Sequence, residues 1–392
     1  ITVSKPVTRS IGASRLPNLL KVGATVVSFA VLAVFGKLTW EQAGIYRDEI
    51  SFYTHIVSFN PEARSIHRNL AKALNDAGRP AEALGASRIA LKQAPGSARA
   101  HNSHGAALLA LDRCDEAGES FGRALELDPG HKYARHNMAS TLRCQGRFEE
   151  AIEWYKKALD TDPEYGAAHV GMGRALFRLR RYEQAEESLA RAMSLRSDTP
   201  IDAFQLLADA LRAQRRHGEA IERYRVVLEI DPDYAPAHAG IGYALLEMQR
   251  YEEAAESLAR SVSIQPASPA VADRHVAMGR AFLALGRTEA SEEHFARALA
   301  IDPDNTKALD SLAVLRFQQQ RYEEALRLYE TLIDLGEGGA QAHANVGATL
   351  YYLGRPEEAH RSLERARALD PTLKTGPTGL EKTRGTSQQE QE

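Results

Sequence analysis

The chain has 392 residues, of which 44% are hydrophobic and 26% charged, a composition that fits a soluble body without long apolar runs beyond its first 40 residues. Its 49 Lys and Arg residues nearly balance its 52 Asp and Glu residues. Basic and acidic residues alternate in segments such as RYEEALRLYE. This mixture argues against a nucleic-acid partner, because binding to phosphate backbones draws on a concentrated basic face.

The first 40 residues contain five basic residues and no acidic one, around the uncharged stretch VGATVVSFAVLAVFG at 22–36. We predict a basic segment over 1–16, a transmembrane helix over 17–40 and a juxtamembrane amphipathic helix over 41–63. Fifteen residues form a helix of only about 22 Å, so flanking leucines must complete the span while lysines snorkel. Basic residues before the span place the amino end in the cytoplasm and the rest of the chain on the non-cytoplasmic side.

A secretory signal peptide is the competing interpretation of this leader, because a basic start, a short apolar core and the small Gly36 are typical of one. Its cleavage would release an exported periplasmic adaptor. Against it, Trp40 occupies a position suited to the lipid headgroups, and an amphipathic helix follows directly. The chain starts at Ile1 rather than Met, which suggests part of a longer protein or a processed one.

From residue 64 onward, a small residue recurs every 34 residues, with two small insertions. These residues are Ala71, Gly105, Ala139, Gly173, Ala208, Gly242, Gly279, Ala313 and Gly347. A second small residue follows twelve positions later, and a proline closes most units. Each unit is therefore predicted to be a pair of short helices that buries its apolar face only by stacking on its neighbours. Such an array favours binding over catalysis.

The units resemble the tetratricopeptide repeat, most clearly in AHVGMGRALFRLRRYEQAEESLARAMSL and AHANVGATLYYLGRPEEAHRSLERARALDP. The resemblance implies an all-α, right-handed superhelical solenoid of nine helix pairs over 64–373, with an adaptor groove and no reaction of its own. Residues 374–392 are predicted to be a polar disordered tail. Because no amphipathic capping helix follows the last repeat, self-association through that repeat is a further possibility.

A protein or peptide partner is expected on the concave surface, formed by the first helix of each unit. The residues predicted to line it become more apolar along the chain: Arg68, Lys72, Asn75, Asn102, His136 and Arg143 come first, and Phe177, Tyr243, Leu246, Leu283, Phe317 and Tyr351 follow. Exposed aromatic residues in a groove anchor extended peptides or helices. The alternative, equally weighted, is that a tight superhelix covers these side chains.

Some tetratricopeptide adaptors bind the terminal carboxylate of a chaperone with Lys and Asn at set positions. Arg68, Asn69 and Lys72 begin such a pattern, but Asn102 and Ser103 do not continue it. That mechanism is therefore disfavoured.

No catalytic motif, cofactor site or metal site is predicted. Recurrent histidines are expected to be structural. His101 and His104 lie three apart on one helix, but no third metal ligand accompanies them. Cys114 and Cys144 lie near the turns of neighbouring repeats; a disulfide is conceivable, although their positions in the repeat differ by four, and free thiols are favoured.

The passage TWEQAGIYRDEISFYTHIVSFNPEARSIHRNLAKAL resembles the juncture between the last membrane helix and the repeats in transmembrane tetratricopeptide-repeat glycosyltransferases. If the resemblance holds, the catalytic residues lie upstream and the repeats form a substrate-binding arm. The preferred prediction is a membrane-anchored, non-catalytic scaffold, with this arm and the exported adaptor as alternatives.

Overall fold

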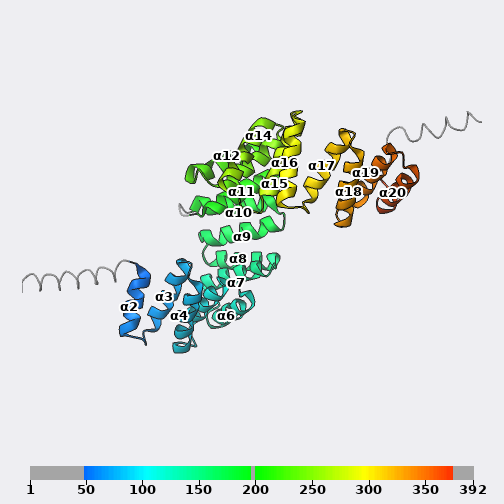
Figure 1. Cartoon of the computed structure of the whole chain (residues 1–392). Helices are drawn as coiled ribbons and strands as arrows, with labels where there is room; N and C mark the ends of the chain where they lie inside the picture. Colours follow the sequence, from blue (N-terminus) through cyan, green and yellow to red (C-terminus); the bar gives the residue numbers. More distant parts are fainter. Residues whose placement is uncertain (1–47, 196–198, 374–392) are drawn as a thin grey trace, which may run out of the picture. The chain divides into compact units, whose positions relative to one another are not determined.

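The computed structural model describes residues 48–195 and 199–373, and this part of the chain is built from helices, α2 to α20 (Figure 1). Helix α2 (Glu49–Phe59) precedes the pairs. The first helices are α3 (Arg64–Asp76), α5 (Ala98–Leu109), α7 (Lys132–Cys144), α9 (Gly166–Arg178), α11 (Ile201–Ala213), α13 (Ala235–Glu247), α15 (Val271–Ala284), α17 (Thr306–Gln318) and α19 (Gly339–Tyr352). The second helices are α4 (Pro80–Gln93), α6 (Cys114–Leu127), α8 (Phe148–Thr161), α10 (Tyr182–Leu195), α12 (His217–Ile230), α14 (Tyr251–Ile264), α16 (Thr288–Ile301), α18 (Tyr322–Asp334) and α20 (Pro356–Leu369).

The helices form two compact units, which we call unit 1 (described from residue 48 to Gly171) and unit 2 (from Met172 to residue 373). Within each unit, a helix packs on the next helix in the chain, and first helices of neighbouring pairs also touch. The predicted all-α solenoid of helix pairs is confirmed. The handedness of the superhelix stays a prediction.

Small residues allow the two helices of a pair to cross closely, as the sequence predicted. A Cβ atom built on Gly105 would lie 2.7 Å from the ring of Phe121 on the second helix, and one on Gly242 would lie 2.6 Å from Leu258. The second column of small residues is equally enclosed, since Ala117 is fully buried. The small residues therefore recur with the repeat because each helix crossing leaves no room for a larger side chain.

The turn between the two helices of a pair contains one residue in the left-handed region. Glycine supplies it in some repeats, as at Gly78 with φ 70° and Gly146 with φ 76°. Other repeats use a larger residue, such as Arg180 with φ 58°. Directly after the turn, an arginine often pairs with the glutamate three residues on, as in Arg147–Glu150 at 2.7 Å.

The described ends of the array are covered differently from the prediction. Ile50, Tyr53 and Val57 of α2 pack against the core of the first pair, so α2 extends the stack. At the other end, the exposed residues of α20 are mostly charged or polar: Glu357, His360, Arg361, Glu364, Arg365 and Arg367. A polar outer helix is typical of the end of a solenoid, and although Leu369 at the end of α20 is 60% exposed, the predicted self-association is not supported.

The predicted localisation needs correction. Among the described helices, none has both the length and the apolar character required to cross a bilayer. The segment predicted to do so, 17–40, and the basic segment 1–16 lie outside the described residues, as does the predicted tail, 374–392. The assignment of a membrane anchor with the repeats on the non-cytoplasmic side is therefore wrong as stated.

Candidate functional site

The first helices of each unit form one surface, which we call the first-helix face. In unit 1, α3 touches α5 and α5 touches α7; in unit 2, α11, α13, α15 and α17 touch in the same way. We number each repeat so that the small residue at the helix crossing is position eight. Positions two, five, nine and twelve, spaced three or four apart, then share one stripe of the first helix.

In unit 2, position twelve of this stripe carries a row of apolar side chains. The row consists of Phe177, Leu246, Leu283, Phe317 and Tyr351, with Arg212 at the corresponding place in α11. All five apolar residues are half-buried. They were predicted to line the groove, and the structure places each of them on the same stripe of its first helix.

Packing against neighbouring aromatic rings contributes to the partial burial of Phe317 and Phe177. Phe317 makes an edge contact with Tyr322 of α18 at 5.4 Å between ring centroids, and another with Tyr352 at 5.5 Å. Phe177 contacts Tyr182 in the same way at 5.4 Å. These rings therefore support the core and also keep some exposed surface. Tyr352, beside the Phe317 cluster, is 50% exposed.

Tyr243, at position nine of α13, lies between the core and a cation. Its ring packs with Leu246 against the cluster around Leu258. The guanidinium of Arg212 lies 5.7 Å from its ring centroid, close enough for a cation–π attraction. Burial raises the pKa of the Tyr243 hydroxyl, with a smaller contribution from Asp273, so this hydroxyl stays protonated at neutral pH.

A hydrogen-bonded network of side chains from α11 and α12 lies next to Arg212. The Tyr224 hydroxyl donates to Asp209 Oδ1 at 2.6 Å, and Arg212 Nε donates to the Tyr224 oxygen at 3.3 Å. Gln205 Nε2 donates to Asp209 Oδ2 at 3.3 Å. Burial raises the pKa of the Asp209 carboxyl despite these donors. The network joins α11 to α12 and fixes the Arg212 side chain beside Tyr243.

Charges on the unit 2 face are largely compensated across neighbouring helices. Arg174 pairs with Asp202 at 2.5 Å, and Lys307 pairs with Asp273 at 3.1 Å. The first pair joins the stripe of α9 to that of α11, and the second joins the stripe of α15 to that of α17. Apolar side chains, not net charge, therefore distinguish this surface.

The unit 1 face has a different character, as the sequence predicted from its polar residues. The predicted residues Arg68, Asn75, Asn102, His136 and Arg143 are half-buried on its first helices. The sixth, Lys72, is exposed and pairs with Asp76 at 2.7 Å.

Two of these residues, Asn102 and His136, contact side chains of neighbouring helices. The Asn137 side chain donates to Asn102 Oδ1 at 3.0 Å, joining α7 to α5. The ring of His136 lies 5.4 Å from that of Tyr155 and 5.2 Å from that of Tyr165. The predicted residues of unit 1 are thus brought onto one face, and those of unit 2 onto another.

Four of the six recurrent histidines have the structural role that was predicted for them. In His67, His101, His169 and His238, Nε2 donates to the carbonyl of the proline six residues earlier, at 2.8 to 3.1 Å. Arg135 takes over this bond to Pro129 in the third repeat. His104, considered as a metal ligand, instead contacts Ser87 Oγ at 3.2 Å. Within the described residues, no three His, Cys, Asp or Glu side chains are grouped to hold a metal ion.

Cys114 and Cys144 form a disulfide, with their Cα atoms 6.4 Å apart. The preference for free thiols is therefore corrected. The four-position offset that argued against pairing places one cysteine at the last residue of α7 and the other at the first residue of α6, and these two helix ends are adjacent. The bond joins the second repeat to the third beside the unit 1 face.

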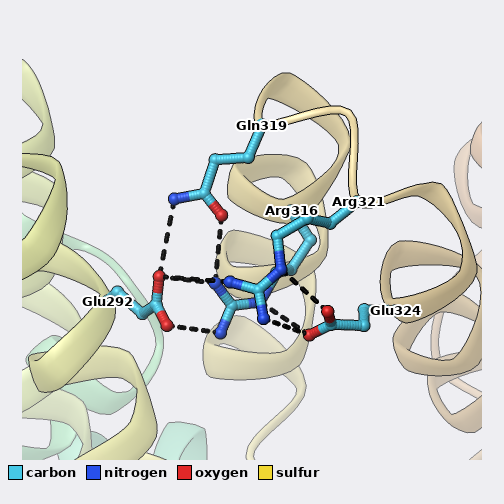
Figure 2. Close-up of polar contacts among 5 residues, drawn as sticks. All are labelled: Glu292, Arg316, Gln319, Arg321 and Glu324. Carbon is cyan, nitrogen blue, oxygen red and sulfur yellow. Dashed lines mark hydrogen bonds and ion pairs between the residues drawn. The ribbon is translucent and has the colours of Figure 1, made fainter.

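Sequence reasoning missed a buried ion cluster in unit 2 (Figure 2). Arg316 of α17 binds Glu292 of α16 through two nitrogens at 2.5 Å, and its Nε lies 3.2 Å from Glu324 of α18. Gln319 and Arg321 complete the cluster. The side chain of Arg316 is only 10% exposed. A signal was available, because position eleven holds a large apolar residue in every other repeat: Leu74, Leu108, Leu142, Leu176, Leu211, Leu245, Phe282 and Leu350.

Comparison with known proteins agrees with this architecture. Profiles of the tetratricopeptide repeat match residues 56–98, 96–164, 142–210, 211–274, 276–340 and 340–373. Small glutamine-rich tetratricopeptide repeat-containing protein 2 of Mycosarcoma maydis is 29% identical over 82 residues, which are 21% of this chain and 23% of that protein. The chain thus spans about a quarter of the length of this curated relative.

Solved structures with helical repeats align with this chain. The Cut9–Hcn1 hetero-tetramer of the APC/C aligns with a TM-score of 0.54 and 19% identity, covering 71% of this chain and 55% of that one. YrrB, described as a TPR protein with an unusual peptide-binding site, aligns with a TM-score of 0.43 and 23% identity, over 50% of this chain and 98% of its own. These matches concern the repeats, and the resemblance of residues 39–74 to a glycosyltransferase juncture stays a prediction.

Proposed function

Because the chain belongs to the tetratricopeptide repeat family, whose members are scaffolds for protein–protein interaction, we propose that the first-helix face of unit 2 binds a peptide or helix of a protein partner. The observation that carries the proposal is the row of half-buried apolar side chains at position twelve. It recurs in one repeat after another on a face whose charges are largely compensated. A partner that covers this row loses little charge solvation and buries apolar area.

Spacing of the row indicates what such a partner looks like. Helices in contact lie about 8 to 10 Å apart, so successive row residues are separated by about that distance. An extended chain advances about 3.3 Å per residue, and a helix about 1.5 Å. The partner should therefore present apolar side chains about every third residue if extended, or about every seventh if helical.

Tyr243 and Arg212 add a polar feature to this row. The tyrosine ring offers a flat apolar surface, and its hydroxyl can donate a hydrogen bond. Arg212 holds the ring from one side. A partner residue with an apolar body and an acceptor at its tip suits this place.

Selection of dodecapeptides from a displayed random library on the immobilised full chain tests the proposal. We expect enriched peptides to carry apolar residues at one of the two predicted spacings. Their binding, measured by fluorescence anisotropy, should fall at least about tenfold, or about 1.4 kcal/mol, in the double variant Tyr243→Ala, Leu283→Ala.

The matched control removes apolar surface from second helices. Ile230 on α12 is 58% exposed and Ile301 on α16 is 49% exposed. The double variant Ile230→Ala, Ile301→Ala should leave peptide binding unchanged. Equal losses in the two double variants, or enriched peptides without apolar residues, would refute the proposed binding face. Circular dichroism confirms that each variant remains helical.

A further inference from the structure

Among the described residues, the first-helix face of unit 1 carries an excess of positive charge, and of its basic residues only Lys72 forms an ion pair, with Asp76 at 2.7 Å. Positions two, five, nine and twelve of α3, α5 and α7 hold Arg68, Lys72, Arg99 and Arg143, and no acidic residue. The same positions in unit 2 include as many acidic residues as basic ones. These are Arg174, Arg212, Arg280 and Lys307 against Asp202, Asp209, Asp273 and Asp310. The excess of charge is therefore particular to unit 1.

Three of the arginines on this face have no carboxylate partner within the described part of the chain. Arg68 makes one long hydrogen bond, 3.4 Å from its Nη2 to Asn69 Oδ1. Arg99 is exposed, and among residues 48–195 and 199–373 no ion pair is formed by it or by Arg143. The Nε atom of Arg143 is buried without a hydrogen-bond acceptor. A buried donor without an acceptor is costly, so a ligand that supplies one is favoured.

Several arginines elsewhere in unit 1 do form ion pairs. Arg113 and Arg147, at the starts of second helices, each bind a glutamate three residues on at 2.7 Å. Within the described residues of unit 1, no arginine of the first-helix face forms such a pair with a glutamate three residues on. Arginines at these helix starts are therefore paired, whereas Arg68, Arg99 and Arg143 are open to a ligand, as is the exposed Arg88 of α4, which lies off the first-helix face.

Amides on the same face suit the main chain of a peptide. In the bond between Asn137 and Asn102, each amide uses only part of its hydrogen-bonding capacity, whichever way it is oriented. The Oδ1 atom of Asn75 is buried without a donor. An extended main chain presents both N–H donors and carbonyl acceptors to such groups.

We propose that the first-helix face of unit 1 binds an acidic, extended segment of a protein partner, whose side-chain carboxylates pair with Arg68, Arg99 and Arg143. This site is separate in residues and in chemistry from the apolar face proposed for unit 2. A nucleic acid fits less well, because residues 48–171 contain 15 basic and 17 acidic residues, a net charge of −2. A long phosphate chain would meet that negative surplus beyond the face, whereas a short acidic segment need not.

The probe is a fluorescent dodecapeptide of alternating Glu and Ser, acetylated and amidated so that no terminal carboxylate contributes. Its binding to the full chain is measured by fluorescence anisotropy at low and at high salt. We expect saturable binding that weakens with salt, and none for the matched Gln and Ser peptide. The triple variant Arg68→Gln, Arg99→Gln, Arg143→Gln should bind about tenfold more weakly, or about 1.4 kcal/mol.

The control variant removes the same charge from second helices, through Arg88→Gln, Arg191→Gln and Arg223→Gln, all exposed. It should change binding less than about twofold. Arg99→Gln alone, at an exposed residue, tests the site without risk to folding and should weaken binding about threefold.

Three results would overturn the proposal. They are no saturable binding of the acidic peptide, an equal loss in the control variant, and displacement of the peptide by an oligoadenylate of twelve nucleotides at lower concentration than by unlabelled peptide. The last result would assign the face to nucleic acid. The Tyr243→Ala, Leu283→Ala variant should leave acidic-peptide binding intact, so that failure of one face is distinguished from failure of the other.

Discussion

Replacing Arg316 by leucine should destabilise unit 2, although leucine is the residue that most other repeats carry at this position. The arginine is 10% exposed and bridges α16, α17 and α18 through Glu292 and Glu324 (Figure 2). Removing one partner from a buried ion pair costs about 3 to 5 kcal/mol. The two glutamates are 32% and 37% exposed, so water partly solvates the carboxylates that are left. We therefore expect a loss of about 2 kcal/mol.

The control is Arg321→Leu, which faces the same carboxylates from an exposed position. Arg321 is 43% exposed and lies 2.7 Å from Glu324 and 3.8 Å from Glu292. An exposed pair contributes about 0 to 1 kcal/mol, so this variant should lose less than about 1 kcal/mol. Urea unfolding followed by circular dichroism measures both. A more stable Arg316→Leu protein, or equal losses in the two variants, would refute the assignment of the stabilisation to burial.

The pH dependence gives a second check on the same cluster. The hydrogen bond from Arg316 is the main cause that holds the pKa of Glu292 below its usual range. A carboxyl with a lowered pKa in the folded state stabilises fully above its unfolded pKa of about 4.3, and this stabilisation is lost as the pH falls through the folded pKa. The difference in the free energy of unfolding between the wild type and Arg316→Leu should therefore be largest at pH 7. It should become smaller below about pH 4.

Three further predictions concern packing, the disulfide and a buried histidine. Gly240→Ala should lower stability by about 1 to 3 kcal/mol in urea unfolding, because the new Cβ would lie 2.4 Å from the Tyr224 ring; Gly218→Ala, with nothing within 4 Å, should not, and equal effects would contradict the crossing argument. Reducing the Cys114–Cys144 bond, which closes 30 residues, should cost unit 1 up to about 3 to 4 kcal/mol, and an unchanged unfolding midpoint with reductant would contradict it. Burial lowers the pKa of His275, so stability should fall as pH drops from about 6.5 towards the folded pKa, and a His275→Gln protein should show a flatter thermal-unfolding profile over pH 7 to 5.

The fold was predictable because each repeat meets the same neighbours. Gly105 and Gly242 stand at crossings where a Cβ would collide with a side chain of the second helix. A steric requirement that recurs every repeat leaves a period in the sequence, and that period is enough to infer helix pairs and their stacking. The apolar residues at position twelve could be predicted for the same reason, because the same stripe of the first helix recurs in each repeat.

Features that depend on a single repeat were harder to predict. The Cys114–Cys144 pair occurs once, at different positions in its two repeats, and only the adjacency of the end of α7 to the start of α6 brings it together. How much of Phe317 stays exposed depends in part on Tyr352, whose position in the repeat holds no aromatic residue in the other repeats. Periodicity carries no information about such contacts, because they are not shared between repeats.

A residue that differs from the type usual at its repeat position is nevertheless informative, because its burial can carry an energetic penalty. A charged residue in a core column must find partners nearby, since an unpaired buried charge is strongly unfavourable. Arg316 stands where most repeats have leucine, and it forms ion pairs with Glu292 and Glu324 on the preceding and following helices. The arginines of the unit 1 face differ, because they occupy the surface stripe and no carboxylate among the described residues pairs with them. The proposed acidic partner would supply the carboxylates that these arginines lack within the described part of the chain.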